Sequence, residues 1–125
     1  MKIFVVLFLA MLPLTVTENY EGEWVYESSS TLFSLTLYQE GSIVKGAHSS
    51  IMLNGSRIDE AMDDEMTLQG SIKNGELIAS IRSAYSGATG KARISVVGQD
   101  SMYFEFVERP EGCWIPDKVV LTKLK

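Results

Sequence analysis

Hydrophobic and polar side chains alternate along most of the chain after residue 17. Phe33, Leu35 and Leu37 alternate with polar neighbours, and the same period of two recurs in later segments. A period of two is typical of strands that turn one face to the core and the other to water. The segment 58–66 forms one helical turn at most, and no other segment indicates a helix. The pattern predicts eight strands, at residues 22–27, 31–39, 43–51, 66–73, 76–83, 90–97, 101–107 and 118–123.

The breaks between these segments are turn sequences. Asn74-Gly75 is the strongest of them, because a type I′ hairpin turn requires positive φ at both central residues. Eight short strands joined by hairpins predict an all-β antiparallel meander, and closing it into a barrel removes exposed edges. We therefore expect a single eight-stranded up-and-down barrel, with a β-sandwich as the alternative. A membrane barrel needs strands of about 9–11 residues, and most of these segments are shorter.

The first 17 residues contain one lysine followed by an apolar run, the pattern of a cleaved secretory signal peptide. The run is shorter than the roughly 20 residues of a spanning helix. We expect residues 18–125 to form one domain, secreted or in a bacterial periplasm, and not to span a membrane once processed. Cys113 is the only cysteine, so no intrachain disulfide is possible. Small secreted eukaryotic domains commonly contain disulfides, which favours a bacterial envelope, and we expect Cys113 to be a buried free thiol.

Gly22-Glu23-Trp24 opens the first predicted strand. A Gly-x-Trp motif in this place, ahead of an eight-strand meander, resembles the calycins, which include lipocalins, fatty-acid-binding proteins and avidins. The resemblance implies that Trp24 closes one barrel end and that Gly22 lets the backbone curve beside it. Lipocalins lay a late arginine over this tryptophan; here Lys118 or Lys123 stands in that position. The binding residues of avidins have no counterpart, so the resemblance implies a barrel and no particular ligand.

No catalytic or metal-binding constellation emerges from the sequence. His48 is the only histidine, it lies in a run of small residues, and we expect it to be a partly exposed strand or turn residue. A zinc site usually takes three protein ligands rich in nitrogen or sulfur, and a single histidine far from a single cysteine does not supply them. We expect a non-catalytic protein without a cofactor.

Charge and loop composition bear on the choice of partner. The chain has 16 acidic and 11 basic residues and a net charge of −5, which argues against binding to nucleic acid phosphates. We expect residues 57–66 to form a solvated acidic loop that faces a basic partner. Aromatic and basic residues mark two further stretches: residues 83–93, which span a connection and the start of the next strand, and the irregular segment 108–117. The candidate partner-binding residues are Asp59, Asp63, Asp64, Tyr85, Lys91 and Trp114.

Two functions fit this sequence. The one we favour is a rigid barrel that binds another envelope or secreted protein through its loops, in the manner of an inhibitor or immunity protein. The alternative is a carrier of a small apolar ligand, because an eight-stranded barrel is just wide enough for side chains or one small molecule. The inward positions mix large and small residues, and we expect a largely filled core.

Overall fold

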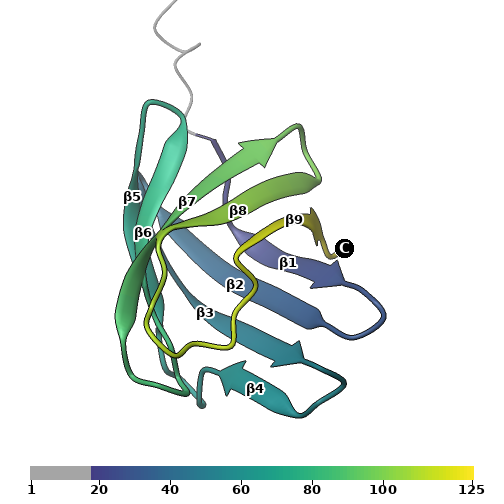
Figure 1. The fold of residues 1–125 in the computed structure, drawn as a ribbon. Coiled ribbons are helices and arrows are strands. Elements are labelled where there is room, and N and C mark those ends of the chain that lie inside the picture. Colours follow the sequence, from purple (N-terminus) through teal and green to yellow (C-terminus); the bar gives the residue numbers. More distant parts are fainter. Residues whose placement is uncertain (1–17) are drawn as a thin grey trace, which may run out of the picture.

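The computed structural model describes residues 18–125, and the predicted signal peptide lies outside the described residues. Every strand pairing is antiparallel, and this part of the chain has no helix (Figure 1). The strands are β1 (Gly22–Glu27), β2 (Leu32–Glu40), β3 (Ile43–Met52), β4 (Arg57–Glu60), β5 (Leu68–Lys73), β6 (Glu76–Arg82), β7 (Thr89–Val97), β8 (Ser101–Glu108) and β9 (Lys118–Lys123).

Eight of these strands form a closed barrel. Around the ring the order is β1-β2-β3-β5-β6-β7-β8-β9, and β9 returns to pair with β1. The predicted eight-stranded antiparallel barrel is therefore confirmed, and the β-sandwich is not formed. Each of the eight strands begins and ends within two residues of its predicted bounds, because the alternation that defines them continues up to the turns.

The ninth strand, β4, was not predicted. It forms a hairpin with the end of β3, where Ile51 is opposite Ile58. The turn between them places Leu53 and Asn54 at φ 54° and Gly55 at φ 94°. The stretch between the predicted strands 43–51 and 66–73 thus contains a short strand, which extends the sheet beside β3 (Figure 1).

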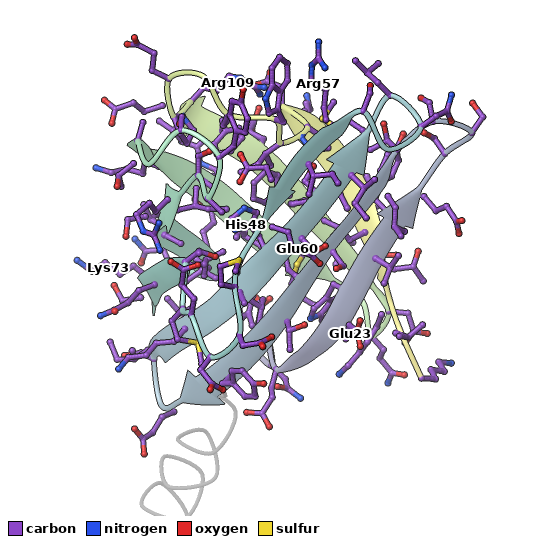
Figure 2. All side chains as sticks on the ribbon, turned by 90° about the horizontal axis from the view of Figure 1, so that it is seen from below. Glu23, His48, Arg57, Glu60, Lys73 and Arg109 are labelled. Carbon is purple, nitrogen blue, oxygen red and sulfur yellow. The ribbon has the colours of Figure 1, made fainter. Side chains whose placement is uncertain are left out.

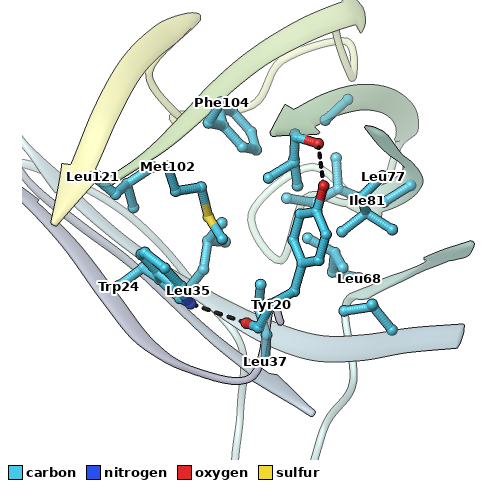
Figure 3. Close-up of a cluster of buried hydrophobic side chains, with 14 of the residues drawn as sticks. Tyr20, Trp24, Leu35, Leu37, Leu68, Leu77, Ile81, Met102, Phe104 and Leu121 are labelled. Carbon is cyan, nitrogen blue, oxygen red and sulfur yellow. Dashed lines mark hydrogen bonds between the residues drawn. The ribbon is translucent and has the colours of Figure 1, made fainter. Parts of the chain in front are cut away.

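The inward side chains of the barrel strands pack into one buried cluster (Figure 3). Phe33, Leu35 and Leu37 are buried as their alternation predicts. Phe33 meets Phe104 edge to face, with ring centroids 5.1 Å apart. Cys113 joins this cluster as a buried free thiol, as expected, and burial raises the pKa of that thiol.

Trp24 is fully buried beside the segment that precedes β1. Its indole Nε1 donates a hydrogen bond to the Tyr20 carbonyl at 3.0 Å (Figure 3). Lys123 on β9 lies over the indole, with Nζ 5.4 Å from the ring centroid. Gly22 has φ +133°, and a Cβ built there would be 2.9 Å from Lys123 Cε. Of the two lysines considered, Lys123 is therefore the one that covers the tryptophan.

Tyr20 fills the core next to Trp24, and the alternation pattern did not indicate it. The Tyr20 side chain is fully buried. Its hydroxyl lies 3.2 Å from the Ile94 carbonyl and 3.3 Å from the Gly75 carbonyl. Burial, reinforced by the nearby carboxylate of Glu18, raises the pKa of Tyr20 to about 12.

Candidate functional site

Asp59 occupies an inward position on β4 and is only 1% exposed. It lies opposite Ser50 of β3, which is also buried, whereas its neighbours Ile58 and Glu60 are exposed. The expectation that Asp59 belongs to a solvated acidic loop was therefore wrong. Residues 57–60 form a strand, and strand geometry turns every second side chain inward.

The Asp59 carboxylate connects four parts of the chain. Oδ1 accepts hydrogen bonds from His48 Nε2 at 2.8 Å and from the Ala84 amide at 2.7 Å. Oδ2 accepts from the Ser83 hydroxyl at 2.5 Å and from the Trp114 amide at 3.0 Å. Burial alone raises the pKa of Asp59, but these hydrogen bonds outweigh it and hold the pKa well below its usual range. Together these contacts form the Asp59 network, which fixes β3, β4, the β6–β7 turn and the segment before β9.

His48 is also buried, at 2% exposure, so the expectation of a partly exposed histidine was wrong. Its Nδ1 lies 2.7 Å from Thr67 Oγ1, and its backbone amide donates to the same oxygen at 3.2 Å. The ionised Asp59 accepts a hydrogen bond from Nε2–H, and in the neutral imidazole Nδ1 is then the acceptor of the Thr67 hydroxyl. Hydroxyl, imidazole and carboxylate thus stand in line, as in a nucleophile relay. Thr67 is only 4% exposed, and its hydroxyl oxygen contacts both the ring and the backbone amide of His48, so these contacts fasten β3 to the segment that leads into β5.

An aromatic cluster lies at the loop end, beside the Asp59 network. Tyr85 and Trp114 meet edge to face with centroids 5.8 Å apart, and the guanidinium carbon of Arg57 lies 4.8 Å from the centroid of the Trp114 ring. Tyr85 is 64% exposed. The Trp114 indole Nε1 is buried and has no hydrogen-bond partner within residues 18–125. These three residues are called the Arg57–Tyr85–Trp114 cluster below.

The backbone beneath this cluster is held from two sides. The Trp114 amide donates to Asp59, and the Trp114 carbonyl accepts a hydrogen bond of 2.6 Å from the Ser50 hydroxyl. The Arg109 guanidinium stacks on the Phe106 ring, 5.6 Å from its centroid. Arg57 and Arg109 lie at the same end of the molecule, away from Glu23 (Figure 2). The segment 109–117 is therefore fastened to the barrel even though it has no regular secondary structure.

The remaining candidate residues lie around this end. Asp63 and Asp64 are exposed in the segment between β4 and β5. Glu65 binds Arg82, and a hydrogen bond from the Met62 amide together with this arginine lowers the pKa of Glu65. Lys91 is exposed on β7, in register with Glu108. The structure thus brings Tyr85 and Trp114 together above Asp59, and it leaves Lys91 outside the cluster.

Two hollows open at the surface elsewhere. One, of about 750 Å³, lies where Glu18, Asn19, Leu124 and Lys125 come together. The other, of about 820 Å³, is lined mainly by residues of β7, β8 and β9, together with Tyr26 of β1 and Glu76 of β6. β1 and β9 pair through Trp24 and Val25, and next to this ladder the Leu124 amide donates to the Glu23 carbonyl.

The described chain is thus a closed antiparallel barrel with one end ordered by a buried carboxylate. Between residues 18 and 125, no group of three histidine, cysteine, aspartate or glutamate residues is placed to hold a metal ion. The same residues include no helix with the length and apolar character to cross a membrane. Comparison of the chain with protein-family models, with curated proteins and with solved structures found no match.

Proposed function

We propose that this is an exported, non-catalytic binding protein whose loop end binds another protein. The Arg57–Tyr85–Trp114 cluster consists of the three residue types that most often dominate the energetics of protein interfaces. Tyr85 is largely exposed, and it stands on the outer side of the cluster. The apolar run in residues 1–17 supports the export part of this proposal. The calycin resemblance supports the scaffold part, because Lys123 lies over Trp24 much as a late arginine does in lipocalins.

The observation that carries the proposal is the attachment of both aromatic residues to one buried carboxylate. Asp59 accepts hydrogen bonds from the Trp114 amide and from the Ala84 amide, next to Tyr85. A loop that is ordered before binding loses less conformational entropy on binding. Because the Asp59 network already orders the cluster, binding of a partner costs little conformational entropy there.

Charge suggests the character of the partner. Asp63 and Asp64 are exposed close in sequence to β4, and the chain as a whole carries a net charge of −5. Opposite charge on a partner accelerates encounter and fixes orientation. A partner with a basic face therefore fits this end best, as a hydrolase inhibitor or immunity-type protein requires.

One observation favours a second candidate, a carrier of a small apolar ligand. The surface hollow of about 820 Å³ along β7, β8 and β9 reaches Tyr26, Phe104 and Val119, which are partly or fully buried. Side chains pack the barrel interior, so this surface hollow is where an apolar molecule would bind.

Native mass spectrometry of the protein purified from the cells or medium that produce it tests both candidates. We expect a stoichiometric protein complex that is lost in Tyr85→Ala and weakened at least tenfold in the double variant Asp63→Asn/Asp64→Asn. Tyr103→Ala is the matched control, because Tyr103 is 54% exposed on β8 and lies outside the cluster. Equal loss in the control, or no protein complex at all, contradicts the proposal. A small-molecule adduct without a protein partner supports the carrier instead.

A further inference from the structure

Two rows of outward side chains line the surface hollow of about 820 Å³ on β7, β8 and β9. The first row is largely apolar. Tyr103 lies opposite Ser95 of β7 and opposite Val120 of β9. Tyr103 is 54% exposed and Val120 is 48% exposed. A half-exposed aromatic ring beside an aliphatic side chain offers apolar contact area to a ligand.

The second row lies two residues away along each strand, and it is charged. Arg93 of β7 is opposite Glu105 of β8, and Glu105 is opposite Lys118 of β9. All three residues line the same hollow. Side chains two residues apart on one face of a strand are separated by about 7 Å. One small molecule can therefore contact the apolar row and the charged row together.

The charged side chains keep hydrogen-bonding capacity for a ligand. Arg93 Nε lies 3.7 Å from Glu76 Oε1, and Arg93 Nη1 lies 3.7 Å from Glu105 Oε1. Both distances exceed the roughly 3.2 Å limit of a good hydrogen bond, so the guanidinium and the two carboxylates can each bind a further group. Together with Lys118, these side chains carry two positive and two negative charges. The polar side of the hollow thus has donors, acceptors and no net charge.

We propose that this hollow binds a neutral amphiphile, a small molecule with an apolar body and an uncharged head that carries hydroxyl groups. The apolar body lies along Tyr103 and Val120, and the head lies among Glu76, Arg93 and Glu105. This inference rests on the second candidate function, a carrier that binds its ligand at this hollow, and it names the class of that ligand.

The balance of charge selects the head group. An anionic head would face the carboxylates of Glu76 and Glu105, and a cationic head would face Arg93 and Lys118. A ligand without any head would cover these charged groups and remove their water without replacing its hydrogen bonds, which is unfavourable. A hydroxyl group both donates and accepts, so it can pair with the guanidinium and a carboxylate at once.

Three probes with the same octyl chain test the head group: octyl β-glucoside, octanoate and octylamine, each kept below the concentration at which it forms micelles. Amide shifts in nuclear magnetic resonance spectra of the isotope-labelled protein give both the place and the affinity of binding. We expect octyl β-glucoside to bind at least tenfold more tightly than either charged probe, with the largest shifts on β7, β8 and β9. Equal binding of a charged probe overturns the neutral head and leaves the carrier standing. No binding of any probe at this hollow overturns both.

Substitutions within the hollow separate the two rows. Tyr103→Ala should weaken the binding of octyl β-glucoside at least fivefold. Tyr38→Ala is the matched control, because Tyr38 is 53% exposed on β2, away from this hollow, and it should leave the affinity unchanged. Equal loss in these two variants contradicts the proposal.

The charged row is tested by the double variant Glu76→Gln/Glu105→Gln. Both side chains are more than 40% exposed, so the fold should be retained. Arg93 and Lys118 then lack their opposite charges, and octanoate should bind at least fivefold more tightly than it binds the native chain. An unchanged affinity for octanoate would show that charge balance does not select the head group.

Discussion

The carboxylate of Asp59 and the imidazole of His48 meet at 2.8 Å, and both side chains are closed to solvent. A buried carboxylate is tolerated only when hydrogen bonds replace its water. Here the donors come from His48, Ser83, Ala84 and Trp114. The barrel end therefore depends on the charge of one side chain on a strand of four residues.

Substitution of this carboxylate should destabilise the fold. In Asp59→Asn one acceptor oxygen becomes an NH₂ group, which then faces donors such as the Trp114 and Ala84 amides. We expect the free energy of unfolding to fall by about 3 kcal/mol, because one partner of a buried pair is lost. Urea unfolding at pH 7 measures this change. Asp63→Asn, at an exposed position, should change the free energy by less than about 0.5 kcal/mol; a comparable loss in both variants would mean that burial is not the cause.

Stability should fall in acid through the same residue. Hydrogen bonds hold the pKa of Asp59 well below its usual range in the folded state, whereas the unfolded chain titrates near 4. The contribution of Asp59 is therefore complete above about pH 5 and is lost progressively as the pH falls through 4 toward the depressed pKa. Urea midpoints at pH 7, 5, 4 and 3 should converge for the native chain and Asp59→Asn. A constant difference down to pH 3 would show that Asp59 titrates normally.

Tyr20 should make the barrel sensitive to alkali. Its folded-state pKa is raised to about 12, while an unfolded tyrosine titrates near 10. The stabilisation is thus fully present below about pH 10 and is lost as the pH rises toward 12. Titration of tyrosinate absorbance should show one of the five tyrosines ionising late, and Tyr20→Phe should remove that late step. If the late step persists in Tyr20→Phe, another tyrosine is responsible.

A side chain at Gly22, next to Trp24, should destabilise the fold. Gly22→Ala adds a Cβ at φ +133°, 2.9 Å from Lys123 Cε. Unfavourable backbone conformations of this kind cost about 1–3 kcal/mol. We expect Gly22→Ala to lower the free energy of unfolding by about 2 kcal/mol, and Lys123→Ala to relieve only the contact part of this loss. Thermal unfolding of the two single variants and the double variant gives the coupling. Full recovery in the double variant would show that the backbone itself is unstrained.

The period of two was enough to predict the barrel strands, because alternation along a strand depends only on residues that are close in sequence. The strand at residues 57–60 was not predicted, because four residues are too few to show a clear alternation. Its two acidic residues also indicated a solvent-exposed loop. The contact of Asp59 with His48 depends on the register of a hairpin, which begins at the Asn54-Gly55 turn. That turn, followed by Ile58 and Asp59 in alternation, was the signal that could have revealed the buried carboxylate. Tyr20 precedes the first strand, so no periodicity applied to it.

The ring is closed by very little hydrogen bonding between its first and last strands. Trp24 and Val25 pair with Lys123 and Thr122, and the Leu124 amide donates to the Glu23 carbonyl. The barrel therefore cannot form its final ladder until β9 has been synthesised, and contacts so distant in sequence slow folding. Until then, β1 and β8 each keep one unpaired edge, which is open to chaperones, proteases and neighbouring chains.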